Sequence, residues 1–245
     1  MYEHIYRKLA VKYRKEHIYW AKKTAFTLAE VLITLGIIGV VAAMTIPNLI
    51  TEHQKRTTVT KLQRAISVIN QAYRLAYDDV GEASAEEAFN MGSEEYFNTY
   101  WAPYIKILTY CSSYKVCGYD SNTPFKLLNG KYSTYHFDYT NGRIAFYTMD
   151  GFVYIVNTYS GYGISPQVVV DINGSAGPNR VGRDIFTLIR VEDDGGGVQP
   201  YGYDFADGDS VNENCSSGSD INPILSTCAE RIRRAGWKIE KDYPW

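Results

Sequence analysis

The chain has 245 residues, of which 45% are hydrophobic and 21% charged, and its formal net charge is −2. This ordinary globular composition excludes a disordered, collagen-like or polytopic membrane protein. The charge is uneven, because residues 1–25 hold seven Lys/Arg and two Glu (+5), whereas the other 220 residues hold 18 basic and 25 acidic side chains (−7). A basic segment, an apolar run and an acidic body are typical of one membrane-crossing segment, and the balance does not favour nucleic acid as a partner.

The apolar run covers residues 26–46, and Glu30 is its only charged residue. As a helix, these residues span about 31 Å, which matches the hydrocarbon core of a bilayer. Lys22 and Lys23 precede the run and predict that the body lies on the non-cytoplasmic side. A cleaved secretory signal and a plain signal anchor are alternatives, but the first has a shorter apolar core and the second leaves Glu30 unexplained. A carboxylate within such a run costs about 2.5–3.5 kcal/mol at its centre, less near an end, and usually has a partner.

The start of the run resembles one family, the type IV pilins and type II secretion pseudopilins. The matching residues are Lys22, Lys23, Thr24, Ala25, Phe26, Thr27, Leu28, Ala29, Glu30, Val31 and Leu32, followed by the apolar helix and Pro47. The resemblance implies a filament subunit, not an enzyme, which a prepilin peptidase cleaves between Ala25 and Phe26 and methylates on the new amine. It also implies that Glu30 pairs with the N-terminal amine of a neighbouring subunit. Ala25 stands where the family normally has glycine, and the leader is longer than many in the family.

The resemblance further implies partners and a location. The partners are other pilin or pseudopilin subunits, the prepilin peptidase and an inner-membrane assembly platform. The location is the bacterial inner membrane, crossed once with the body in the periplasm, and then a filament. A membrane-anchored extracytoplasmic binding module that displays a tyrosine-rich sheet without polymerising is the competing hypothesis.

The helical pattern continues past Pro47, since an interior proline can kink a helix without ending it. Apolar residues recur with helical spacing to about residue 79, so we expect one helix over 26–79 whose second half is a core helix. The predicted organisation is a basic leader (1–25), the long helix (26–79, with 26–46 as transmembrane and assembly segment) and a globular head (80–245).

Within the head, residues 81–92 predict a loop, and Ser93 is a candidate cap for a short helix through about residue 108. Asn141-Gly142 and Asp150-Gly151 indicate hairpin turns. The predicted strands are 132–139, 143–149, 152–157, 167–172 and 185–191. Asp193-Asp194-Gly195-Gly196-Gly197 is the expected break before an irregular C-terminal segment. A long N-terminal helix followed by an antiparallel meander predicts the α+β class. The pilin resemblance implies the same fold.

Four cysteines, Cys111, Cys117, Cys215 and Cys228, follow the apolar run and therefore lie in an oxidising compartment on this topology. Three pairings are possible. Local pairing is favoured because it closes two short loops, and the spacings suit a metal site less well. The resemblance implies that a loop closed by Cys215 and Cys228 shapes the displayed surface.

Catalytic motifs are absent from the sequence: there is no G-x-S-x-G, P-loop or Rossmann fingerprint, and His53 and His136 fit no ligand pattern. No cofactor is expected, with calcium as one open alternative. Asp171, Asn173 and Asp184 offer hard oxygens for Ca²⁺, but Gly174 comes too early for an EF-hand. An ordinary Asn-Gly turn after a strand explains the same residues.

Overall fold

The computed structural model describes residues 26–135, 142–158, 166–191 and 197–245. The chain divides into two compact units, residues 1–51 and 52–245. The second unit combines helices with one antiparallel sheet and two disulfides, which confirms the predicted α+β class. The leader and the cleavage-site residue Ala25 lie outside the described residues.

The long helix α2 runs over Leu28–Val80, so the helix predicted over 26–79 is confirmed. Pro47 lies inside it, as expected for a proline that does not end the helix. The second half buries a stripe of apolar side chains with helical spacing, which makes it the core helix of the second unit. These residues are Val59, Leu62, Ala65, Ile69, Ala72, Tyr73 and Ala76.

Six strands form one meander in the order β1-β2-β3-β4-β5-β6, and every neighbouring pair is antiparallel. The prediction is confirmed to within two residues for β2 (Arg143–Thr148), β3 (Val153–Asn157), β4 (Gln167–Asp171) and β5 (Ile185–Val191). The turn between β2 and β3 has Gly151 at φ 84°, a left-handed conformation that favours glycine. The Asp-Gly pair was therefore a correct turn signal.

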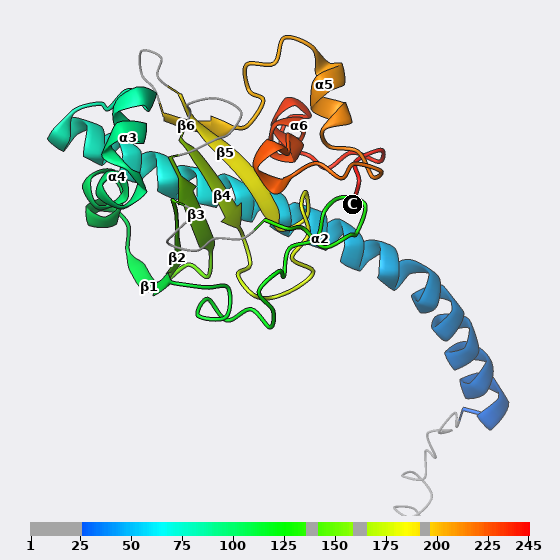
Figure 1. Cartoon of the computed structure of the whole chain (residues 1–245). Coiled ribbons are helices and arrows are strands. Elements are labelled where there is room, and N and C mark those ends of the chain that lie inside the picture. The colour runs from blue at the N-terminus through cyan, green and yellow to red at the C-terminus, as the bar shows by residue number, and fades with distance from the viewer. Residues whose placement is uncertain (1–25, 136–141, 159–165, 192–196) are drawn as a thin grey trace, which may run out of the picture. The chain divides into compact units, whose positions relative to one another are not determined.

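The second half of α2 packs on one face of this sheet (Figure 1). The hydroxyl of Tyr154, in β3, donates to the carbonyl of Ala65 in the helix at 3.2 Å. At the sheet edge, the side-chain amide of Asn70 donates to the carbonyl of Val198 at 2.8 Å and accepts from its N–H at 2.7 Å. Asn70 thus binds both backbone groups that Val198 presents on the free side of strand β6 (Gly197–Pro200).

Two expectations before the sheet are wrong. Residues 81–92 contain helix α3 (Ala85–Met91), which a capping box between Ser84 and Glu87 starts. The helix expected over 93–108 is only α4 (Ser93–Tyr100), followed by η1 (Ala102–Tyr104) and strand β1 (Ile107–Cys111). Ser93 does not cap α4: Gly92 holds that position, and the Ser93 hydroxyl bonds to the Gly142 carbonyl instead. Pairing with β2, a long-range contact, makes residues 107–111 a strand.

The strand predicted over 132–139 is also wrong in its described part, where Tyr132 makes one isolated bridge to Lys126 and residues 133–135 form no strand. Residues 136–141, and with them His136 and Asn141 of the predicted turn, lie outside the described residues. Residues 192–196, which make up most of the expected break, also lie outside the described residues, and Gly197, the last residue of that break, begins β6. The segment after β6, predicted as irregular, contains α5 (Gly208–Glu213), η3 (Pro223–Leu225) and α6 (Cys228–Arg234).

Candidate functional site

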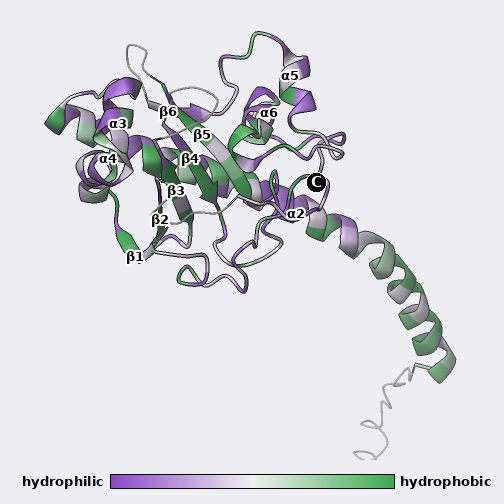
Figure 2. Cartoon of the chain, in the orientation of Figure 1, coloured by the Kyte–Doolittle hydropathy of each residue, from purple (hydrophilic) through white to green (hydrophobic). Residues whose placement is uncertain are grey.

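The described part of the first unit presents an apolar surface that nothing in the structure covers. Phe26 is 84% exposed and Leu28 78%, and the large apolar residues from there to Ile50 are exposed in the same way. Figure 2 shows this end of α2 as predominantly hydrophobic. Among the described residues, α2 is the one helix with a stretch long and apolar enough to cross a membrane. Each large side chain gains about 1.5–3 kcal/mol on leaving water, so this surface requires a bilayer or other apolar helices.

Glu30 sits in the first turn of α2 and is held there by Thr27. The Glu30 carboxylate accepts from the backbone N–H and from the hydroxyl of Thr27, both at 2.8 Å. The Thr27 oxygen in turn accepts from the Glu30 N–H at 3.2 Å. This reciprocal pattern is a capping box, which satisfies two backbone donors at the start of a helix.

The sequence contained this signal as Thr27-x-x-Glu30, and our sequence reasoning missed it. In the single chain, one carboxylate oxygen of Glu30, Oε2, already accepts both hydrogen bonds from Thr27. Phe26, the residue implied as the mature N-terminus, directly precedes Thr27. The predicted scissile bond and the predicted assembly carboxylate are therefore separated by one turn of helix.

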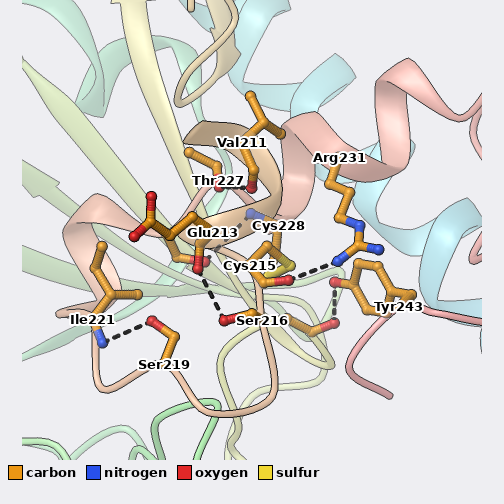
Figure 3. The surroundings of a disulfide bond; sticks show 12 residues. Val211, Glu213, Cys215, Ser216, Ser219, Ile221, Thr227, Cys228, Arg231 and Tyr243 are labelled. Carbon is orange, nitrogen blue, oxygen red and sulfur yellow. Dashed lines mark hydrogen bonds between the residues drawn. A yellow bond between two sulfur atoms is a disulfide. The ribbon is translucent and has the colours of Figure 1, made fainter. Parts of the chain in front are cut away.

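The two disulfides join Cys111 to Cys117 and Cys215 to Cys228, which is the local pairing. Cys215 and Cys228 are fully buried, so the second bond lies beneath the surface and connects the residues just after α5 with the start of α6 (Figure 3). The segments around it are bonded further: Thr227 donates to the Val211 carbonyl at 2.6 Å, and Arg231 donates to the Cys215 carbonyl at 2.8 Å. This disulfide braces the C-terminal segment from within.

Asp171 and Asp184, the candidate calcium ligands, are both buried and accept hydrogen bonds from the chain itself. Asp171 accepts from the Tyr119 hydroxyl at 2.8 Å and the Asn173 N–H at 3.1 Å. Asp184 accepts from the backbone N–H groups of Asn179 at 2.7 Å and Arg180 at 2.5 Å. Burial raises the pKa of Asp171 well above its usual range, and the nearby Asp184 raises it further. Burial likewise raises the pKa of Asp184, to about 6.

This arrangement braces the β4–β5 connection through side-chain to backbone bonds. Across the described ranges, no group of three or more His, Cys, Asp or Glu side chains is placed to hold a metal ion. His53 is exposed on α2 and lies in no such group. The structure therefore brings Asp171 and Asp184 together, but their carboxylates accept hydrogen bonds from backbone N–H groups of the β4–β5 connection.

Two family models match the chain. The model described as a prokaryotic N-terminal methylation motif matches residues 20–46. A family of unknown function (DUF6613) matches residues 48–153 and adds no activity. No curated protein and no solved structure is significantly similar to the chain.

The methylation motif, which ends at residue 46, includes Phe26, the Thr27–Glu30 capping box and most of the exposed surface described above. Proteins with this motif are structural and not catalytic. The chain carries the prepilin segment of a type IV pilin-like or pseudopilin precursor.

Proposed function

We propose that this protein is a structural subunit of a type IV pilus-like or type II secretion filament. In this proposal a prepilin peptidase cuts before Phe26 and methylates the new amine while the subunit sits in the inner membrane. The head lies in the periplasm, and an assembly platform then transfers the subunit into the polymer. The first half of α2 packs among other copies, and Glu30 pairs with the amine of a neighbour.

One observation carries the proposal: within the methylation motif, residues 28–46 form a helix whose apolar side chains are exposed all around. A core helix of a soluble protein buries such a surface, and a lone anchor has no use for a carboxylate at this depth. A filament supplies both an apolar environment from neighbouring helices and a cation for Glu30. Methylation leaves that amine charged, so both members of a buried ion pair are present.

The first test is mass spectrometry of the mature N-terminus after expression with a prepilin peptidase. We expect a chain that begins at N-methylated Phe26. An intact Met1 would contradict the proposal, and a chain cut near residues 41–43 would indicate a secretory signal instead.

The second test separates the two roles available to Glu30. Glu30→Ala removes both the charge and the cap, and we expect it to abolish incorporation into filaments while membrane insertion is unchanged. Glu30→Gln keeps a capping-box side chain but removes the charge, and we expect the same loss. Thr27→Val, the matched control, removes the capping hydroxyl and leaves the charge. We expect Thr27→Val to assemble; assembly of Glu30→Gln at the wild-type level would show that the pairing with an amine is not needed.

The competing proposal, an anchored binding module, predicts that all three variants behave alike, since no polymer forms.

The calcium hypothesis for Asp171, Asn173 and Asp184 is a separate proposal about the head. Calorimetric titration with Ca²⁺ is expected to show heat and a higher melting temperature if the ion binds. Absence of both effects would rule out calcium binding at this site.

A further inference from the structure

Charged residues are strongly segregated along the first third of the second unit. Residues 53–74 contain five Lys/Arg and no Asp or Glu, whereas residues 75–105 contain seven Asp/Glu and no Lys or Arg. Such a division is not needed for folding, because charges of both signs on an exposed helix face normally alternate and support one another.

The basic half is a hollowed surface on which three residues are exposed and three are partly buried, and the acids Glu52 and Asp184 also line its hollows. We call it the basic surface: His53, Lys55, Arg56, Lys61, Arg183 and Lys238. Lys61 and Arg183 line a cavity of about 270 Å³, and a groove of about 620 Å³ lies between Lys55 and Arg56 on α2 and Lys238 in the C-terminal segment. Lys55 pairs with Glu52 at 3.1 Å, but in the described part of the chain Arg56 and Lys61 have no ion-pair partner.

The acidic half is formed by the end of α2 together with α3 and α4. We call it the acidic surface: Asp78, Asp79, Glu82, Glu86, Glu94 and Glu95. All six side chains are exposed. Asp79 and Glu82 accept tyrosine hydroxyls from Tyr104 and Tyr73, whereas Asp78, Glu86, Glu94 and Glu95 have no ion-pair partner among the described residues.

Lys61 of the basic surface and Asp79 of the acidic surface cannot pair within one molecule. Lys61 and Asp79 are 18 residues apart on the same helix, which corresponds to about 27 Å, far beyond ion-pair contact and beyond the screening length of about 8–10 Å in physiological salt. They can meet only between molecules. A contact between two different surfaces of identical subunits is heterologous, and when its rotation does not close it produces an open helical filament.

We propose that the basic surface of one copy docks on the acidic surface of the next, and that this contact sets the register between heads in the polymer. The inference rests on the proposed function, since it concerns the same assembly. Single exposed ion pairs contribute little, so the contact selects partner and register, as complementary charged surfaces do. The apolar helices and Glu30 remain the main source of cohesion.

The test uses the full chain, expressed in membranes with the prepilin peptidase and the assembly platform, and counts the fraction recovered in filaments. Arg56→Glu with Lys61→Glu is expected to lower that fraction about tenfold, and Asp78→Lys with Glu94→Lys to do the same. The chain that carries all four substitutions has exchanged the charge at these four positions, and we expect assembly to return in part. Lys115→Glu with Lys131→Glu, at exposed positions outside both surfaces, is the control with an equal change of net charge and should assemble normally.

Zero-length carbodiimide cross-linking of assembled wild-type protein gives a direct reading. We expect amide bonds between Lys55, Lys61 or Lys238 and acids of residues 78–95. For Lys61 and Asp79, the distance within one copy forbids such a bond.

The proposal would be overturned if the basic double variant lost assembly while the acidic one did not, and if the chain with all four substitutions did not recover. That result would point to anionic lipid headgroups as the partner. If Glu30→Ala abolishes filaments while every charge variant assembles normally, the proposed function stands and this inference falls. If the wild-type chain is processed but forms no filaments, the proposed function itself fails.

Discussion

The two halves of α2 have the same secondary structure but differ in how their apolar side chains are covered. Before residue 52 the apolar side chains surround the helix and are exposed; after it they form one stripe that is buried against the sheet. In the second half, polar and charged residues occupy the other faces, so one fold partner satisfies the helix. The first half has no polar face for water, and no single partner from its own chain can cover it. The difference shows that the apolar residues which stabilise the head and those left exposed occupy separate stretches of one helix.

The strongest way to break this comparison is the same substitution in each half. Leu62 is completely buried, and Leu62→Ala should lower the free energy of unfolding of the head by about 2–5 kcal/mol through lost burial and a cavity. Leu35 is 60% exposed, and Leu35→Ala should leave head unfolding unchanged. Denaturant unfolding of the full chain in detergent, followed by tryptophan fluorescence, measures both. Equal effects would mean that the two halves are not energetically separate.

A second prediction concerns the bracing of the C-terminal segment. Replacing Cys215 and Cys228 together by serine should cost about 3 kcal/mol of unfolding free energy, because the bond closes the longer loop. The matched pair Cys111→Ser with Cys117→Ser should cost about 2 kcal/mol, since its loop is shorter. Neither change should alter insertion or processing of the first half of α2. A larger cost at the shorter loop would contradict this account.

A third prediction concerns pH. Burial raises the pKa of Asp184 to about 6 and that of Asp171 well above its usual range, so folding favours the protonated acids. Their stabilising contribution is complete below about pH 4, the unfolded pKa, and is lost as the pH rises through the folded values. We expect the head to lose more than about 2 kcal/mol between pH 4 and pH 7, measured by urea unfolding, because Asp184 alone accounts for about that much. Asp171→Asn should reduce this slope, because one acid no longer ionises; an unchanged slope would exclude Asp171 as a source.

The smallest expected effect is at the sheet edge. Asn70→Ala removes two hydrogen bonds to Val198 and leaves those backbone groups to water, so we expect a cost of about 1–2 kcal/mol. Asn98→Ala, at an exposed position on α4 without a side-chain hydrogen bond in the described structure, is the control and should cost less than half as much. Hydrogen exchange should also become faster at Val198. Protection that persists there would mean that Asn70 is not what covers the edge.

Sequence patterns predicted those elements whose conformation is determined mainly by neighbouring residues in the chain. The long helix and strands β2–β5 followed from periodicity and from the Asp150-Gly151 turn. Strand β1 was missed because it exists only through pairing with β2, and its burial does not alternate: the consecutive residues Leu108, Thr109 and Tyr110 are all exposed. Helix α3 was missed although the capping-box motif Ser84-x-x-Glu87 indicates the start of a helix. Helix α6 was missed although Glu230 pairs with Arg233 and Arg234 at helical spacings.

The candidate site divides in the same way. Glu30 could be found from sequence, because a charge inside an apolar run is conspicuous. Its bond to Thr27 was also written in the sequence but was overlooked. The proximity of Asp171 and Asp184 was anticipated, whereas the backbone donors that occupy their oxygens come from the folded loop and could not be read from spacing.

The amide of Asn70 has one more consequence. An open strand edge presents unpaired backbone groups that can pair with a strand of another chain and start cross-β aggregation. By imitating a peptide group against Val198, a single side chain from the helix closes that edge of the sheet to an incoming strand at this position. The same helix whose first half exposes an apolar surface thus also protects the sheet edge at Val198 from amyloid-like strand pairing.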